Sequence, residues 1–235
     1  MVNKPNAYEA VARISHVRPL CGLPQKVAPA HTALVVIDMQ NDFIADGCLM
    51  GQEGWNLSAV QEMAARLPAL IAAARKSGIT VIFVRNVYST ERNFYLSDVW
   101  LEQAARKRPG GYTYIPGCEA DSRGGDFYGD VRPKLGDPVV IKHRYNGFHN
   151  TDLDIILRAH GIRTLVFTGV STNCCVETTA RDAFMRDYYV IVVDDATASY
   201  AQAFHEMALK NIDSLFGEIT TIAALSAIWE GYSAG

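Results

Sequence analysis

The sequence has no hydrophobic run long enough to span a membrane and no block of basic residues. Its 22 lysines and arginines are spread among 25 acidic residues, which gives a net charge of −3. A bilayer-spanning helix needs about 20 mostly apolar residues, and nucleic-acid-binding domains usually carry a basic patch. We therefore expect neither a membrane nor a nucleic acid as partner. Residues 1–30 lack a continuous apolar core, so they do not resemble a signal peptide.

Cysteine is scarce. The chain has five cysteines among 235 residues. An odd number of cysteines in a chain of this length does not indicate the disulfide framework of a small secreted domain. Hydrophobic residues make up 49% of the chain and charged residues 20%, the usual balance of a globular protein. We expect a cytoplasmic enzyme in a reducing compartment.

What is present is a regular alternation of apolar runs and helical patterns. The five consecutive apolar residues 33–37 predict a strand buried on both faces, as in a parallel sheet. Further strands are predicted at 79–85, 139–142, 164–168, 190–194 and 218–221. Helices are predicted at 57–76, 98–107, 152–160, 175–188, 201–216 and 223–229. This alternation predicts a doubly wound α/β fold, with residues 1–31 as an N-terminal arm and residues 32–235 as one domain.

Reactive side chains stand where three of these strands end. Asp38 follows the first, Lys142 ends the third, and Cys174 and Cys175 follow the fourth. Doubly wound sheets bind ligands at the carboxyl ends of their strands. A thiol that attacks an amide needs a base, a nearby cation and donors for the oxyanion. Taken singly, a solvated Asp38 and a surface Lys142 are the commoner interpretations. Cysteines packed as small hydrophobes are as good an interpretation as a nucleophile.

The two cysteines fall in the first turn of a predicted helix. Thr172 and Asn173 are favourable N-cap residues for it. Free N–H groups and the helix dipole favour negative charge there, so we expect a lowered pKa for the thiol. Redox chemistry between Cys174 and Cys175 is an alternative, although a disulfide between adjacent residues is strained and rare.

Three motifs carry a resemblance to a known family. They are Val35–Phe43, Lys142–Phe148 and Thr168–Ala183, and together with their spacing they resemble the isochorismatase-like cysteine hydrolases over residues 32–221. The resemblance implies a six-stranded parallel sheet flanked by helices. It also implies a catalytic triad of Asp38, Lys142 and Cys175, because the family's nucleophile directly precedes Val in this motif. A non-proline cis peptide is implied at Val170–Ser171, which would turn the N–H groups of Ser171 and Cys175 toward one oxyanion.

Departures from parts of the family narrow the implied activity. Isochorismatases proper lack the cysteine that this chain has. Nicotinamidases carry an Asp-x-His metal motif after the second strand, where this chain reads Arg85-Asn86-Val87-Tyr88. The spacing of His143 and His149 matches no common metal site. We therefore predict no catalytic metal and no cofactor.

Within the family the chain most resembles the ureidoacrylate amidohydrolases. Residues 142–154 are similar to their segment Arg-Tyr-Ser-Gly-Phe-Phe-Asn-Thr, and the implied substrate-binding residues are Asn86, Tyr88, Tyr145 and Phe148. The predicted activity is metal-independent hydrolysis of a C–N bond in a small ureido, carbamoyl or amide substrate. Biuret, triuret and N-carbamoylsarcosine are alternative substrates; a nicotinamidase or a domain that only binds ligands are more distant ones.

A long connection, Asn86–Asp137, separates the second and third predicted strands. Connections of this length usually form a lid or an interface. It contains Trp100, Tyr112, Tyr114 and Tyr128, and aromatic residues are enriched at interface cores. The resemblance implies assembly as a homodimer or homotetramer.

Overall fold

The computed structural model describes residues 16–87, 94–106 and 117–233. Its centre is a six-stranded sheet in the order β3-β2-β1-β4-β5-β6, and every neighbouring pair is parallel. The predicted doubly wound fold with a six-stranded parallel sheet is therefore confirmed. The strands are β1 Thr32–Ile37, β2 Thr80–Asn86, β3 Val139–Lys142, β4 Thr164–Val170, β5 Tyr189–Ala198 and β6 Glu218–Thr220.

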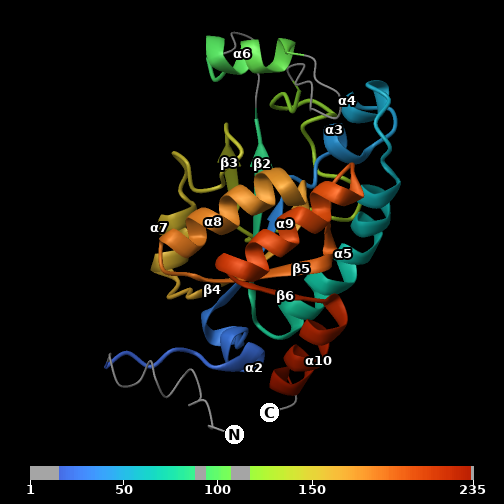
Figure 1. The fold of residues 1–235 in the computed structure, drawn as a ribbon. Coiled ribbons are helices and arrows are strands. Elements are labelled where there is room, and N and C mark those ends of the chain that lie inside the picture. The colour runs from blue at the N-terminus through green and yellow to red at the C-terminus, as the bar shows by residue number, and fades with distance from the viewer. Residues whose placement is uncertain (1–15, 88–93, 107–116, 234–235) are drawn as a thin grey trace, which may run out of the picture.

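Helices cover both faces of the sheet (Figure 1). One face packs against α5 (Ser58–Lys76), α10 (Ile222–Ser233) and the short α3 (Asn41–Ile44) and α4 (Leu49–Gln52). The other face packs against α7 (Leu153–Ala159), α8 (Glu177–Met185) and α9 (Gln202–Leu215). Successive strand residues point to opposite faces. In β1, Leu34 and Val36 join the first core, whereas Ala33, Val35 and Ile37 join the second.

The strand order reverses beside β1. The chain builds β2 and β3 on one side of β1 and then crosses to place β4 on the other. At the carboxyl ends of β1 and β4, Ile37 lies opposite Gly169. Gly169 has a φ of 104°, and a Cβ there would lie 2.0 Å from the Ile37 carbonyl oxygen. Only glycine lets the two backbones approach this closely at the reversal point.

The fifth strand is longer than predicted. Its polar residues Asp194 and Asp195 interrupt the apolar run, which is why the pattern placed its end at 194. Backbone pairing continues beyond an irregularity, with Thr197 opposite Gly169 and Ala198 opposite Val170. The strand therefore reaches the carboxyl edge of the sheet.

Part of the predicted arm has regular structure. Gly22–Lys26 forms the short helix α2, and Pro29–His31 forms the 3₁₀ turn η1. Val27 is buried between them, and its carbonyl accepts a hydrogen bond from Trp229 Nε1 at 3.0 Å. Trp229 is itself fully buried, so α10 holds this part of the arm against the domain.

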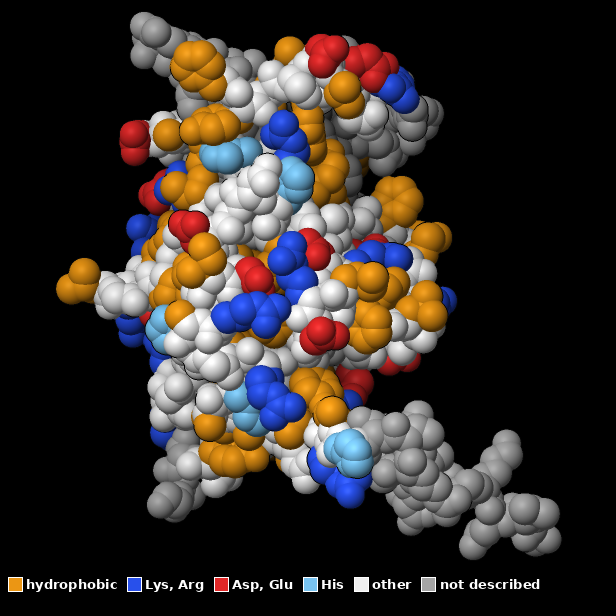
Figure 2. All heavy atoms as spheres, turned by 90° about the vertical axis from the view of Figure 1, so that its left-hand side faces the viewer, with side chains coloured by type: hydrophobic (Ala, Val, Ile, Leu, Met, Phe, Trp, Pro, Cys, Tyr) orange, Lys and Arg blue, Asp and Glu red, His pale blue; other side chains and the backbone are white. Residues whose placement is uncertain are grey.

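The surface mixes charges of both signs. On the face shown in Figure 2, basic and acidic side chains are interspersed. Arg158 pairs with Asp154 and Arg186 with Asp182, each four residues apart on a helix, an exposed arrangement that contributes only about 0.3–0.5 kcal/mol. Among the described residues, none of the helices has both the length and the apolar character to cross a membrane.

Candidate functional site

Side chains from three strand ends meet in the interior. Lys142, the last residue of β3, places Nζ 2.8 Å from Oδ2 of Asp38, which directly follows β1. The same Nζ lies 3.4 Å from Sγ of Cys175, which follows β4, and donates to the Arg144 carbonyl at 3.1 Å. Asp38, Lys142 and Cys175 are 1%, 0% and 6% exposed. The three residues that the sequence singled out thus form one buried cluster.

A tight turn orients Asp38. Its N–H donates to the Val84 carbonyl at 2.8 Å, and its φ is +51°. Aspartate is one of the few non-glycine residues that adopts this left-handed region with some frequency. The Gln40 N–H then donates to the Asp38 carbonyl at 2.8 Å. The chain therefore leaves β1 sharply, and the carboxylate stays beside Lys142.

The turn that carries the thiol differs from the predicted helix start. The peptide Val170–Ser171 is cis, and Thr172–Val176 forms a single π turn, η2, before α8 begins. The N-cap residue is Ser171, so the prediction of Thr172 and Asn173 as caps is wrong. The Thr172 hydroxyl lies 2.8 Å from His205 Nδ1, and Asn173 Oδ1 accepts a hydrogen bond from Ser199 Oγ at 2.6 Å. These tertiary partners replace the local capping bonds.

Burial and the charges within the cluster together set the pKa values of its members. Desolvation raises the pKa of Asp38 despite the opposing effect of the Lys142 charge. Desolvation alone lowers the pKa of Lys142, but the charges of Asp38 and Cys175 outweigh it and hold that pKa above its ordinary value. Lys142 is therefore an ammonium at neutral pH.

The thiol of Cys175 behaves differently from the prediction. A hydrogen bond with Cys174, burial and the Asp38 charge raise its pKa well above the ordinary value, and Lys142 only partly offsets them. The lowered pKa expected from the helix dipole is wrong for this buried site. At rest, the site holds a neutral thiol beside an aspartate–ammonium pair. Such a site can form a thiolate by passing the thiol proton to Asp38.

The structure places Asn86 next to this cluster. In the β2–β3 register Asn86 lies opposite Lys142. Its side chain is fully buried, and its Oδ1 and Nδ2 have no hydrogen-bond partner among the described residues. A buried carboxamide left unpaired costs about 1–3 kcal/mol. That cost is recovered if a ligand supplies one acceptor and one donor.

The other implied substrate-binding residues have different surroundings. Tyr88 lies outside the described residues. Tyr145 is half-buried, with its ring 4.8 Å from that of Trp100 in an edge-on contact. Phe148 is buried, stacks on Tyr188 at 6.1 Å, and belongs to the same core cluster as Cys175.

Sequence reasoning missed Gln40. This fully buried residue accepts from the Asn86 N–H at 2.7 Å and donates to the carbonyls of Asn86 and Gly125 at 3.0 and 2.8 Å. It therefore fixes the end of β2 and ties it to the segment around Gly125. The polar run Gln40-Asn41-Asp42, placed directly after a buried strand, was the available indication.

Asp42 anchors the same segment. Its carboxylate accepts from the N–H groups of Cys118 and Leu49 at 2.6 and 3.2 Å. A Cβ on Gly124 would lie 2.3 Å from the Asp42 carboxylate. The second half of the long connection is thereby packed against the residues that follow Asp38.

The helix α6 (Asp98–Ala105) stands beyond the carboxyl ends of the strands (Figure 1). The Arg144 guanidinium lies 5.0 Å from the Trp100 ring centre and donates to the Tyr95 carbonyl at 2.8 Å. A cavity of about 290 Å³ lies between this helix and Tyr145. Residues 94–106 of the long connection are thus held over the loop that follows Lys142.

The two histidines in the loop after Lys142 make contacts with nearby groups of the protein. His143 Nδ1 lies 2.7 Å from the Val87 carbonyl oxygen, and its ring stacks on Tyr95 at 3.7 Å. His149 Nε2 lies 3.3 Å from Asn150 Nδ2. Within residues 16–87, 94–106 and 117–233, no three His, Cys, Asp or Glu side chains are grouped as metal ligands.

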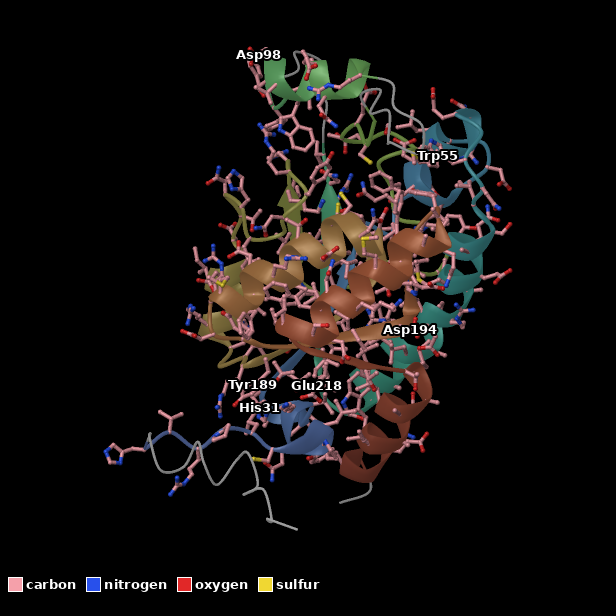
Figure 3. All side chains as sticks on the ribbon, viewed as in Figure 1. His31, Trp55, Asp98, Tyr189, Asp194 and Glu218 are labelled. Carbon is pink, nitrogen blue, oxygen red and sulfur yellow. The ribbon has the colours of Figure 1, made fainter. Side chains whose placement is uncertain are left out.

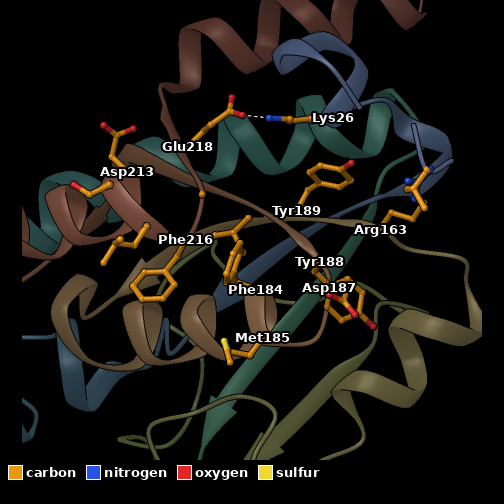
Figure 4. A pocket seen from close by; sticks show the side chains of 15 residues that line it. Lys26, Arg163, Phe184, Met185, Asp187, Tyr188, Tyr189, Asp213, Phe216 and Glu218 are labelled. Atoms are coloured by element: carbon orange, nitrogen blue, oxygen red, sulfur yellow. Dashed lines mark hydrogen bonds and ion pairs between the residues drawn. The ribbon is translucent and has the colours of Figure 1, made fainter. Parts of the chain in front are cut away.

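A larger cavity of about 900 Å³ lies at the opposite, amino-terminal edge of the sheet (Figure 4). Tyr189 at the start of β5 and Glu218 at the start of β6 line it. Figure 3 shows both residues near His31, at the far end of the molecule from Asp98. This cavity is therefore separate from the Asp38–Lys142–Cys175 cluster.

Comparisons with known proteins agree with the fold. The isochorismatase domain matches residues 32–224. Ureidoacrylate amidohydrolase RutB of Enterobacter sp. (strain 638) is 38% identical over 208 residues, covering 83% of this chain and 88% of that protein. A cysteine hydrolase from Pseudomonas syringae pv. phaseolicola 1448A superposes with a TM-score of 0.75 at 29% identity, covering 91% and 98% of the two chains. For N-carbamoylsarcosine amidase from Thermoplasma acidophilum the TM-score is 0.66 at 28% identity, covering 82% and 96%. The chain belongs to the isochorismatase domain family.

Proposed function

We propose that this chain is a cysteine amidohydrolase that cleaves a C–N bond of a small ureido or carbamoyl compound through an acyl-cysteine intermediate. The observation that carries the proposal is the Cys175 thiol held beside the buried Lys142–Asp38 pair. The resemblance to ureidoacrylate amidohydrolase RutB at 38% identity supports the substrate class. The structural similarity to N-carbamoylsarcosine amidase favours carbamoyl compounds as the second candidate class.

The proposed reaction gives each member of the cluster a distinct role. Asp38 takes the proton of Cys175, and the thiolate attacks the carbonyl carbon. The N–H groups of Ser171 and Cys175 stabilise the oxyanion. Asp38 returns the proton to the leaving nitrogen as the C–N bond breaks. Water then hydrolyses the thioester, with Asp38 again accepting a proton, and the thiol is regenerated. Lys142 keeps Asp38 ionised in its buried position.

Asn86 suits the recognition of a ureido group. Such a group has a carbonyl acceptor and N–H donors that need partners once they leave water. The unpaired carboxamide of Asn86 supplies one acceptor and two donors beside the reacting atoms. We assign Tyr88, Tyr145 and Phe148 to the remaining walls of the substrate site. Of Tyr145 and Phe148, only Tyr145 carries a hydroxyl group that can hydrogen-bond to a substrate.

We also propose that the chain assembles as a homodimer or homotetramer. The support is the projecting segment around α6, where Phe94, Val99 and Leu101 expose large apolar side chains. Exposed apolar groups clustered on a projecting element are typical of interfaces. Sedimentation at micromolar concentration is expected to give a mass of two or four chains. A monomer under these conditions would contradict the proposal.

The choice of sulfur is tested by two single substitutions. Cys175→Ser is expected to lower kcat by about 10⁴-fold or more, as removal of a nucleophile does, and to leave the unfolding temperature near that of the wild type. Cys174→Ala is the matched control and keeps substantial activity, because its thiol contacts Cys175 without reaching the substrate. Ammonia release from ureidoacrylate and mass spectrometry of acid-quenched enzyme measure both. Equal losses, or an acyl adduct on Cys174, would show that the wrong sulfur is assigned.

The pH profile of kcat/KM tests whether the Cys175 thiol passes its proton to Asp38. The active form needs Asp38 ionised and Cys175 protonated. Because the pKa of Asp38 is raised, activity falls on the acid side at a pH above the ordinary aspartate value of about 3.9. Because the pKa of Cys175 is raised, the basic limb lies above the ordinary thiol value of about 8.5, and a plateau joins the two. Activity that instead rises between pH 8 and 9 would mean that titration, not transfer to Asp38, makes the thiolate.

Substrate preference tests the role of Asn86. Ureidoacrylate, biuret and N-carbamoylsarcosine are compared with nicotinamide, and at least one ureido or carbamoyl compound is expected to exceed nicotinamide in kcat/KM by about tenfold or more. Asn86→Leu, close in size but apolar, is expected to reduce that advantage. The control is the rate at which iodoacetamide alkylates Cys175, which is expected to be nearly the same in Asn86→Leu and in the wild type. Nicotinamide equal to or better than every ureido compound would refute the substrate class.

A further inference from the structure

A series of hydrogen bonds links β5 and α9 to the π turn η2, which carries Cys175. Asp194 of β5, labelled in Figure 3, places Oδ1 2.9 Å from His205 Nε2. His205 of α9 places Nδ1 2.8 Å from the hydroxyl of Thr172, the first residue of the π turn η2. Thr172 is fully buried and His205 is 8% exposed, whereas the Asp194 side chain is 51% exposed.

The direction of these bonds follows from their chemistry. A carboxylate can only accept, so an imidazole with its single proton on Nε2 donates that proton to Asp194. Its Nδ1 is then an acceptor, and the Thr172 hydroxyl donates to it. The order carboxylate, imidazole, hydroxyl is that of a hydrolase triad. Thr172, however, is fully buried, so its hydroxyl has no exposed surface on which to meet a substrate. This series of hydrogen bonds therefore serves to hold the turn to which Thr172 belongs.

A second contact holds the next residue of the turn. Ser199, just beyond β5, donates from Oγ to Asn173 Oδ1 at 2.6 Å and accepts from the Asn173 N–H at 3.4 Å. The two residues that precede Cys174 and Cys175 are therefore both held by side chains from the β5–α9 region.

The opposite flank of the turn is held as well. Thr179 donates its hydroxyl to the Cys175 carbonyl at 2.6 Å and accepts from the Gly147 N–H at 2.9 Å. Gly147 lies in the loop that follows Lys142. Thr179 thus fixes Cys175 relative to Lys142, and His205 with Ser199 fixes the start of the turn.

We infer that His205 is a positioning residue: with Asp194, it holds Thr172 so that the π turn presents Cys175 and the backbone N–H groups in reacting geometry. Its expected effect on turnover rests on the proposed function, whereas its effect on the rigidity of the turn does not. Thr172 is three residues before Cys175, so a small rotation of Thr172 moves the sulfur and the donors together. A misplacement of about 1 Å at a reacting group can cost about 10²-fold in rate.

Replacing His205 by asparagine or by glutamine tests its two hydrogen bonds one at a time. Asparagine places its carboxamide near the position of Nδ1, so His205→Asn retains an acceptor for Thr172. Glutamine places its carboxamide near Nε2, so His205→Gln retains a donor for Asp194 and loses Thr172. Thr172→Val removes the hydroxyl without changing the size of the side chain. Thr164→Val is its matched control, because Thr164 is also fully buried but its hydroxyl has no hydrogen-bond partner among the described residues.

The variants are compared by hydrogen exchange of peptides that cover residues 171–177 and by kcat and KM on ureidoacrylate. His205→Gln and Thr172→Val are each expected to speed exchange in these peptides and to lower kcat by about 10- to 100-fold, with KM within threefold of the wild type. The double variant is expected to be no worse than either single one, because both remove the same bond. His205→Asn and Thr164→Val are expected to stay within threefold in kcat.

Three outcomes would overturn the inference. They are unchanged exchange in His205→Gln and Thr172→Val, faster exchange with an unchanged kcat, and fully additive losses in the double variant. If the wild-type enzyme releases ammonia from none of the ureido or carbamoyl compounds, the proposed substrate class fails by itself. The exchange comparison then still decides whether His205 holds the turn.

Discussion

The buried ion pair between Lys142 and Asp38 is the constraint around which the rest of the site is arranged. Both side chains are withdrawn almost completely from water, and burying an isolated charge costs several kcal/mol. Neither group is tolerable there without the other, so the ends of β1 and β3 must be held at a fixed separation. The intervening strand β2, with Gln40 bonded to both backbone groups of Asn86, supplies that spacing.

The same pair explains why a neutral thiol is suited to the proposed chemistry. Burial and Cys174 keep Cys175 protonated, so the site does not carry an exposed, readily oxidised thiolate between turnovers. In the proposed reaction the thiol proton moves only to Asp38, whose own pKa is raised toward that of a useful base. Lys142 remains charged because the charges of Asp38 and Cys175 outweigh its desolvation. In this proposal, proton transfer within the cluster, rather than the helix dipole, generates the nucleophile.

Precision at the sulfur depends on elements that do not touch the reacting atoms. The π turn is bounded by Thr179 and Gly147 on the side of Lys142 and by His205 and Ser199 on the side of β5 and α9. Because β5 continues to Ala198 and pairs with the end of β4, Ser199 comes within reach of the turn, whereas Asp194 acts on it through His205. The unusually long strand and the polar contacts around the turn are therefore two parts of one arrangement.

The sequence by itself determined the parallel sheet, because runs such as residues 33–37 and 165–167 are apolar at every position, and only a sheet covered on both faces buries them completely. Chain order and strand ends also brought out Asp38, Lys142 and the two cysteines, and family resemblance distinguished Cys175 from Cys174. Local patterns failed where distant residues compete with local ones. The local pattern predicts Thr172 and Asn173 as helix caps. Their side chains instead hydrogen-bond to His205 and Ser199, which lie more than 20 residues away in the chain. The thiol pKa and the open hydrogen bonds of Asn86 were decided only by the tertiary structure, because both depend on which groups exclude water from the end of the sheet.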